Sequence, residues 1–448
     1  MIRTKRPEAD RMSEPPKKTP FSDLPANPVP APTPQHSTLN YQQFYGWTIV
    51  GLLWVVANLN YLDRLMLVSM RESVKSSIVM TDAQFGLLTS VFLWVYGALS
   101  PLGGFLADRF SRKWVIVGSL ATWSAMTWVT GHVHTFQGLL AARAFMGVSE
   151  AFYMPAGLAL ITEWHRGTTR SLATGIHMSG LYAGAALGGL GGYIAESYGW
   201  RQGFTWFGVF GIAYAIVLCY GLRDSGPGDS TAAIQRREER ATCSWRQALR
   251  ALFGQPSFLA LTTYFSLAAL ASWGITGWLP TFLREQFSLG QGKAGMSATG
   301  YIQIGSYLGV LVGGALSDRW VQRNRRGRLY IVVIGFCVGG PSLFLMAGAH
   351  LFAGAIAGML LYGLARGFSD ANTMPILCQI IGKKYRATGY GFLNLFSTCA
   401  GGAMIYLGGA LRDSNVSLVR VFQASALGLV IAGLILLAVR PSRSKEEN

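Results

Sequence analysis

Charged residues are scarce in this chain of 448 residues, because Asp, Glu, Lys and Arg together make up only 13% of it. A soluble globular domain has about 25% charged residues. The hydrophobic fraction is 51%, and most of the 55 glycines lie within apolar segments. Glycine-rich apolar helices are typical of close packing in a bilayer. The composition therefore excludes a disordered protein and argues against a soluble domain with a single core.

Cysteine is also sparse, and no pair among the five has the spacing of a metal site or a disulfide. No nucleophile, base and acid occur at a recognisable catalytic spacing, so we expect neither an enzyme nor a bound metal or cofactor. The net charge of +17 would suggest a nucleic-acid partner for a soluble protein. In a membrane protein it indicates Lys- and Arg-rich cytoplasmic loops instead.

The first 43 residues differ sharply from the rest. Residues 1–43 are polar, basic and rich in proline, a composition that cannot bury a core, so we expect a disordered cytoplasmic tail. From residue 44 onward twelve apolar segments alternate with short polar ones, and each approaches or exceeds the ~20 residues that span a bilayer. The segments are 44–70, 82–107, 113–131, 136–163, 169–195, 201–222, 255–283, 292–317, 328–348, 350–382, 386–411 and 417–439.

These segments predict an all-α integral membrane protein with twelve transmembrane helices in two six-helix bundles. The expected parts are an N-terminal bundle (44–222), a cytoplasmic connecting loop (223–254), a C-terminal bundle (255–440) and a cytoplasmic tail (441–448). With both termini in the cytoplasm, roughly four times as many Lys and Arg face the cytoplasm as face outside. The predicted location is the plasma (inner) membrane, and we expect a monomer.

The two halves share short sequence matches at nearly one offset. The string Gly-Gly-Phe-Leu-Ala-Asp-Arg at 103–109 matches Gly-Gly-Ala-Leu-Ser-Asp-Arg at 313–319, and 142–145 matches 365–368. A Met-Pro pair recurs at a similar distance. Such matches predict that the bundles are related by a parallel pseudo-repeat.

The polar stretch between the second and third segments carries a family motif. Residues 104–113, Gly-Phe-Leu-Ala-Asp-Arg-Phe-Ser-Arg-Lys, resemble the signature loop of the major facilitator superfamily, with Ser111 where the family usually has Gly. The resemblance covers roughly residues 44–440 and implies a loop whose contacts change between conformations. The implied gating residues, including the weaker copy in the second half, are Asp108, Arg109, Arg112, Asp318 and Arg319.

Two short stretches of sequence resemble particular families within this superfamily. Asn-Tyr-Leu-Asp-Arg at 60–64 and Arg-Ala-Phe-Met-Gly-Val-Ser-Glu-Ala at 143–151 resemble the anion:cation symporters, which carry sugar acids and other organic anions with protons. The first string, and an Arg and a Glu in the fourth segment, also resemble Spinster-type transporters of lysolipids. The C-terminal half resembles both groups less closely.

By resemblance to the symporters, Asp63 and Glu150 would take up protons, while Arg64 and Arg143 would meet the substrate carboxylate. Ionisable groups inside a span are costly and are usually functional or paired. Arg143 and Glu150 are seven residues apart, which places them on one helix face about 10 Å from each other. Burial favours a protonated carboxyl group and a nearby Arg favours the charged one, so an anion that engages the Arg promotes protonation. The alternative is a set of static salt bridges.

Other polar residues within the spans are further candidates for substrate contacts. Tyr61, Tyr96 and Asn394 match polar contacts of the symporters, and His177 and Gln303 could also contact the substrate. Hydrogen bonds between helices are the alternative role for each.

Two further patterns favour structural roles. Arg366 and Asp370, one turn apart, would neutralise each other. The glycines at 180, 184 and 188 predict close helix packing.

These observations predict a secondary transporter that takes up a small organic anion with protons, such as a hexuronate, an aldonate or sialic acid. One alternative is a Spinster-like lysolipid transporter. Another is an organophosphate exchanger, which would need cationic groups from both bundles, with Arg366 as the one candidate in the second. The loops between segments are too short for the soluble domain of a receptor.

Overall fold

The computed structural model describes residues 35–165, 169–224, 245–382 and 385–440, and it shows helices joined by short connections, with no strand in these ranges. The chain divides into two units, Met1–Gln42 and Gln43–Asn448. In the first unit, residues 35–42 are helical. The second unit contains everything discussed below.

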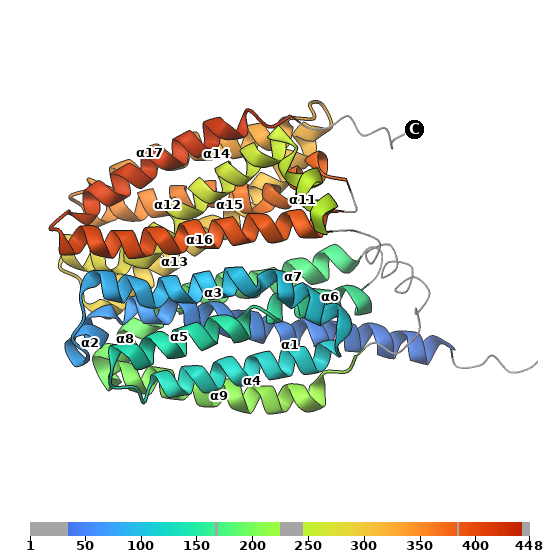
Figure 1. The fold of residues 1–448 in the computed structure, drawn as a ribbon, viewed down its shortest axis with the longest axis horizontal. Helices are drawn as coiled ribbons and strands as arrows, with labels where there is room; N and C mark the ends of the chain where they lie inside the picture. Colours follow the sequence, from blue (N-terminus) through green and yellow to red (C-terminus); the bar gives the residue numbers. More distant parts are fainter. Residues whose placement is uncertain (1–34, 166–168, 225–244, 383–384, 441–448) are drawn as a thin grey trace, which may run out of the picture. The chain divides into compact units, whose positions relative to one another are not determined.

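The first helices of the second unit lie together in one bundle, drawn in blue to green in Figure 1. Its members are α1 (Gln35–Ser69, from residue 43), α2 (Arg71–Ser77), α3 (Asp82–Arg109), α4 (Arg112–Thr130), α5 (Phe136–Glu150), α6 (Tyr153–Trp164), α7 (Arg170–Leu187), α8 (Leu190–Tyr198) and α9 (Trp200–Gly221). We call this group the N-bundle. The end that carries α2 is called the α2 end, and the opposite end, near residues 108–113, the signature-loop end.

The remaining helices form the C-bundle, drawn in yellow-green to red in Figure 1. Its members are α11 (Trp245–Phe253), α12 (Pro256–Phe287), α13 (Gln291–Val321), α14 (Gly327–Ala347), α15 (Phe352–Ile380), α16 (Arg386–Asp413) and α17 (Leu418–Leu436). The bundles meet where α3 packs against α16 and where α13 packs against α7 and α8. Residues that face this junction can therefore change neighbours if the bundles move.

Each of the twelve predicted segments lies on a helix or a pair of helices. Segment 136–163 is divided into α5 and α6 because Pro155 has no N–H to donate to the carbonyl of Ala151. By length and composition, nine helical stretches of the described residues could cross a membrane. Helices α4, α7 and α13 are not among them, since polar side chains such as Lys113, His177 and Gln303, together with Gly, Ser and Thr, lower their mean hydropathy. The count of twelve spans and the pseudo-repeat stay predictions.

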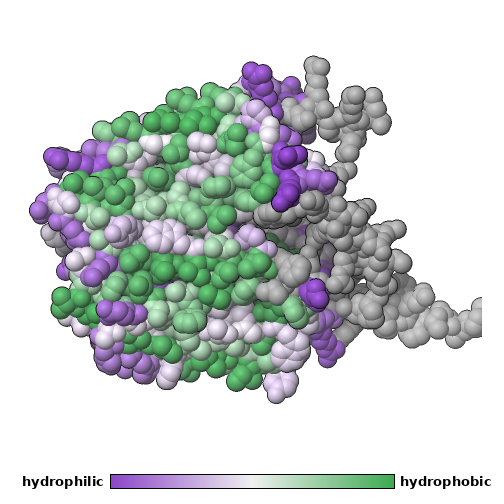
Figure 2. Space-filling model, viewed as in Figure 1, coloured by the Kyte–Doolittle hydropathy of each residue, from purple (hydrophilic) through white to green (hydrophobic). Residues whose placement is uncertain are grey.

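On the face drawn in Figure 2 the middle of this unit is largely apolar, and hydrophilic residues gather toward its ends. Large apolar side chains are exposed along α9, α14 and α17, such as Phe210, Leu345 and Ile431. An apolar surface this broad would be unstable in water but suits lipid chains. The helical architecture and this surface support a multi-pass membrane protein.

Glycines let the helices approach closely. A Cβ atom added at Gly184 would lie 2.0 Å from the carbonyl oxygen of Asn58, and one at Gly180 2.7 Å from that of Trp54. One added at Gly188 would lie 2.6 Å from Cβ of Leu65. The predicted role of this glycine spacing in close packing is confirmed, with α1 as the partner.

The predicted connecting loop contains the short helix α11. Phe253 at its end packs edge-on against Phe258 and Phe392 of the C-bundle. Residues 225–244 of the predicted loop lie outside the described residues, as do most of the predicted tail 1–43 and all of 441–448.

Candidate functional site

A buried ion pair joins α1 to α5. Nε of Arg64 donates to Oε2 of Glu150 at 2.8 Å, and Nδ2 of Asn60 donates to the same oxygen at 2.8 Å. Asn60 and Arg64 reach it together because they are one turn apart on one face of α1. All three side chains are buried. The sequence predicted functional roles for Arg64 and Glu150. It predicted none for Asn60, although this residue begins the motif at 60–64.

Aromatic rings surround the guanidinium of Arg64. Its Cζ lies 4.8 Å from the ring centroid of Tyr61, 5.0 Å from that of Phe92 and 4.5 Å from that of Tyr96. The face of an aromatic ring attracts a cation, and more strongly where water is excluded. The rings therefore stabilise the charge of Arg64 whether or not Glu150 is charged.

Asp63 and Arg143 flank this pair without joining it. Oγ1 of Thr127 donates to Oδ2 of Asp63 at 3.2 Å, which ties α4 to α1. Cζ of Arg143 lies 4.9 Å from the Phe92 ring centroid, so the guanidinium groups of Arg64 and Arg143 share this ring. Thr127 was not predicted as a site residue, because a threonine within an apolar segment carries no distinctive sequence signal.

Several polar atoms of this cluster are buried without a hydrogen-bond partner among the described residues. They are Oδ1 of Asn60, Oδ1 of Asp63, Nη2 of Arg64, Nη2 of Arg143 and Oε1 of Glu150. Buried polar atoms are normally paired, so unpaired ones mark positions that can take a ligand or a proton. The cluster offers cationic donors for an anion and carboxylate oxygens for protons.

The other predicted substrate residues lie in different surroundings. His177 is fully buried, and its Nε2 is 2.9 Å from the hydroxyl of Tyr153 within the N-bundle. Gln303 is buried in α13. Nδ2 of Asn394 donates to Oγ of Ser100 at 3.2 Å, from α16 to α3 across the junction. Their contact with a substrate stays a prediction.

The predicted gating residues lie at the signature-loop end. Arg112 pairs with Glu163 at 2.6 Å, and Asp318 pairs with Arg328 at 2.6 Å. The side chains of Arg109 and Arg319 are exposed, and that of Asp108 lies outside the described residues.

Ser111, which stands where the signature loop usually has glycine, has a structural role. The hydroxyl of Ser111 accepts from the backbone N–H of Trp114 at 3.3 Å and caps the start of α4.

An ionic cluster that was not predicted from the sequence lies at the α2 end. Nε of Arg412 (α16) donates to Oδ2 of Asp82 (α3) at 2.9 Å, and its two Nη atoms bind Glu285 at 2.9 and 2.7 Å. Asp82 also pairs with Arg71 and Lys75. The available signal was the presence of acidic residues, Asp82 and Glu285, close to Lys and Arg residues that had served only to assign orientation.

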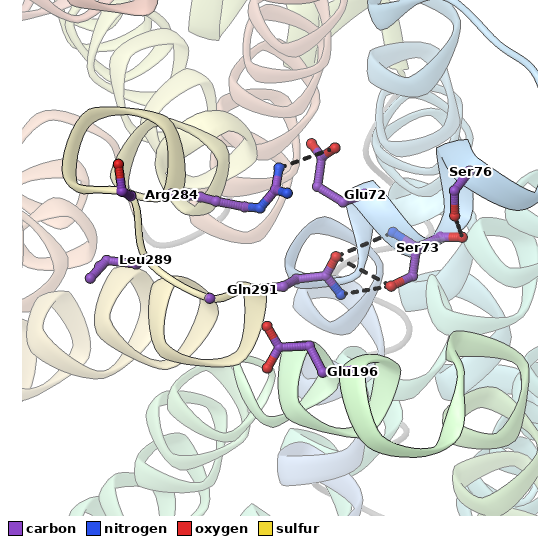
Figure 3. Close-up of a pocket in the computed structure, with 9 residues that line it drawn as sticks. Glu72, Ser73, Ser76, Glu196, Arg284, Leu289 and Gln291 are labelled. Carbon is purple, nitrogen blue, oxygen red and sulfur yellow. Dashed lines mark hydrogen bonds and ion pairs between the residues drawn. The ribbon is translucent and has the colours of Figure 1, made fainter.

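Further contacts across the junction surround a pocket at this end (Figure 3). Glu72 of α2 pairs with Arg284 of α12 at 3.2 Å. Oε1 of Gln291 accepts from the backbone N–H of Ser73 at 3.2 Å. Together with Arg412, these contacts hold the N-bundle and the C-bundle together at the α2 end.

Comparison with known proteins identifies the family. The sequence pattern of the Major Facilitator Superfamily matches residues 53–406, most of the chain. The chain belongs to the major facilitator superfamily. Its members are transporters rather than enzymes in general, so a small-molecule substrate and a membrane setting follow from membership.

Relatives within the superfamily have different described roles. The chain is 28% identical to an efflux pump of Mycolicibacterium smegmatis, over 87% of this chain and 89% of the relative. It is 25% identical to a probable sulfoacetate transporter of Cupriavidus necator, over 88% and 93%. It is 26% identical to the protein spinster of Drosophila melanogaster over 82% of this chain, a match that spans 62% of that relative's length.

A solved structure shares the fold. It is a bacterial homologue of the human lysosomal transporter Spinster, in an inward-facing and occupied conformation. The TM-score is 0.73 at 20% identity, and the match covers 89% of this chain and 99% of that one. The relatives and this structure support a superfamily transporter with Spinster-like features.

Proposed function

We propose that this superfamily member is a proton-coupled symporter of a small organic anion, such as a hexuronate, an aldonate or sialic acid. The observation that carries the proposal is the buried pairing of Arg64 with Glu150, flanked by Asp63 and Arg143. Arginine binds carboxylates through its fork of donors, and each carboxylate can take up a proton.

The pairing of Arg64 with Glu150 links substrate binding to proton uptake. A charged Glu150 accepts from both Asn60 and Arg64, so it competes with a substrate carboxylate for Arg64. Protonation of Glu150 weakens this pair and releases Arg64, and a substrate bound to Arg64 in turn favours protonation of Glu150. Because this linkage is reciprocal, a proton gradient can drive accumulation of the anion.

The transport cycle we propose is alternating access by twelve transmembrane helices in a monomer of the plasma (inner) membrane. Lys and Arg concentrate at the end predicted to be cytoplasmic, which supports an outer location for the α2 end. The contacts of Arg412 and Arg284 across the junction then close the outer side in this conformation. Opening outward requires that these ion pairs separate.

The relatives support two substrate classes. The probable sulfoacetate transporter supports an organic anion. The similarity to protein spinster and the shared fold with the bacterial Spinster homologue support the alternative, a lysolipid. The buried ion pair of Arg64 with Glu150, which Asn60 also binds, favours the small anion.

Uptake by the purified protein in liposomes tests the proposal. We expect labelled glucuronate, gluconate or sialic acid to accumulate when the outside is acidic, and a protonophore to abolish this accumulation. Protein-free liposomes are the control. Absence of gradient-driven uptake of every acid, together with transport of lysolipid, would replace the proposal by the Spinster-like alternative.

A further inference from the structure

The short helix α11 carries its polar and apolar residues on opposite sides. At about 100° per residue, Arg246, Gln247 and Arg250 fall within an arc of about 100°, and Leu252 lies on the other side of the helix. The three polar residues are exposed, whereas Leu252 is completely buried. A helix with one basic face and one apolar face is typical of the boundary between lipid and water.

The apolar side of α11 is fixed to the C-bundle. Leu252 packs close to Gly389 at the start of α16, where an added Cβ atom would lie 3.3 Å from Cδ2 of Leu252. The ring centroid of Phe253 lies 5.6 Å from that of Phe258 in α12 and 6.2 Å from that of Phe396 in α16. These contacts leave the basic side of α11 facing away from the bundle.

Helix α11 lies at the signature-loop end of the C-bundle, as Figure 1 shows. Helices α12 and α16 reach the α2 end near Arg284 and Arg412, which contact the N-bundle there. The starts of these helices, and α11 with them, are therefore at the opposite end, which the distribution of Lys and Arg predicts to be cytoplasmic. Phe396, which contacts Phe253, is 40% exposed, so exposed apolar surface extends to α11 itself.

The arginines of α11 have no acidic partner among the described residues. Neither Arg246 nor Arg250 forms an ion pair within these ranges, and both are exposed. At this end of the C-bundle the described residues include one carboxylate, that of Asp318, and it pairs with Arg328 at 2.6 Å. Arg440, whose backbone contacts the start of α12, adds another exposed cation. The basic face of α11 is therefore uncompensated within the described part of the chain.

We propose that α11 is an interfacial helix whose Arg246 and Arg250 bind the headgroups of anionic phospholipids in the cytoplasmic leaflet. A phospholipid carries its phosphate next to its acyl chains, which matches a basic helix face at the edge of an apolar surface. Arginine binds phosphate through its fork of donors. A soluble phosphate has no part that matches the apolar surface, so charge and apolarity together favour a lipid. This role is independent of the transported substrate.

Photo-crosslinking from α11 tests this contact in the full-length chain. The photoreactive residue benzoylphenylalanine replaces Gln247, beside both arginines, and the protein is placed in vesicles of equal parts phosphatidylglycerol and phosphatidylcholine. Mass spectrometry counts the lipids crosslinked after illumination. Attraction of about 1 kcal/mol per basic residue at an anionic surface corresponds to roughly 5-fold for one arginine and 30-fold for two. We therefore expect phosphatidylglycerol to exceed phosphatidylcholine by roughly 5- to 30-fold among the crosslinked lipids.

Variants of the two arginines assign the preference to this face. Arg246→Gln/Arg250→Gln should lower the lipid ratio by roughly fivefold or more, whereas Arg246→Lys/Arg250→Lys should keep most of it because the charges remain. Lys293→Gln/Arg420→Gln removes two exposed cations at the α2 end and, as the charge-matched control, should keep the original ratio. A ratio near one before these changes, or an unchanged ratio in the double Gln variant, would overturn the proposal.

Two further measurements distinguish a lipid from other anions. Glycerol 3-phosphate, added in excess at constant ionic strength, has a phosphate but no acyl chain and should leave the lipid ratio unchanged. Loss of the lipid crosslink on its addition would assign the arginines to a soluble phosphate instead. A crosslink from position 247 to the chain itself, at the acidic Glu238 or Glu239, would show that the connecting loop covers α11 and would also overturn the proposal.

Discussion

Arg64 donates through Nε to Oε2 of Glu150 at 2.8 Å, and both side chains are almost completely buried. Removing one partner of a buried pair leaves an uncompensated charge, which is strongly unfavourable. Here the rings of Tyr61, Phe92 and Tyr96 around the guanidinium of Arg64 moderate that cost. In the proposed mechanism this pair separates when Glu150 takes up a proton, and the rings reduce the cost of leaving the Arg64 charge unpaired.

Replacing Glu150 by Gln tests proton coupling. Gln has the same shape as Glu but cannot take up a proton in the pH range of the assay. Glu150→Gln should therefore abolish accumulation driven by a pH gradient, while exchange of labelled for unlabelled substrate continues. Both activities are measured in the same liposomes. Glu196→Gln, an exposed carboxylate of α8, is the control. Normal accumulation by Glu150→Gln would remove Glu150 from the coupling mechanism.

Removing the charge of Asp82 should open the α2 end. Asp82 pairs with Arg71, Lys75 and Arg412, and the last of these contacts crosses the junction. The loss of such contacts weakens the closed form by about 1–3 kcal/mol, which shifts the ratio of conformations roughly 5- to 150-fold. Spin labels at Ser76 and Gln286, on opposite bundles, report the distance at this end.

We expect a longer distance between these labels in Asp82→Asn than in the otherwise unmodified protein. Glu196 lines the pocket at the α2 end without an ion pair to a described residue, so Glu196→Gln should keep the original distance distribution. An unchanged distribution in Asp82→Asn would show that the ionic cluster does not stabilise closure.

Helix packing predicts opposite effects for two glycines of α7. A Cβ added at Gly184 would lie 2.0 Å from the carbonyl oxygen of Asn58, whereas one at Gly175 meets nothing within 4 Å. Gly184→Ala should destabilise the protein by about 1–3 kcal/mol through overpacking. Gly175→Ala should be neutral or stabilise by about 0.5–1 kcal/mol, because alanine favours helix. Thermal unfolding in detergent distinguishes them, and equal stabilities would contradict the packing.

The burial of His177 separates two roles for this residue. It is fully buried against Tyr153, so His177→Asn should lower thermal stability by about 1–3 kcal/mol, the cost of an unsatisfied buried group. Substrate affinity, measured by calorimetry, should stay within about twofold of the wild type for a residue that only packs. A tenfold loss of affinity without loss of stability would support the substrate contact predicted from the sequence.

Local sequence was enough to predict the class of protein and part of the site. Long apolar segments predict helices in a bilayer because the backbone has no other partner there, and the signature loop at 104–113 indicates the family. Arg143 and Glu150 share a helix stripe by spacing alone. Small-residue spacing at 180, 184 and 188 predicts close packing, since only glycine permits such an approach.

The tertiary structure decided which charges meet. No spacing along the chain relates Arg64 to Glu150, Arg412 to Asp82, or Tyr182 to Asp370, because each pair lies on separate helices brought together by apolar packing. The same packing brings Arg284 and Arg412, which the sequence predicts to lie outside, into contacts between the bundles. The sequence by itself determined helices, family and the scarcity of buried charge, and only the packing of the helices decided which buried charge faces which, since Coulomb and hydrogen-bond energies depend on distance in space.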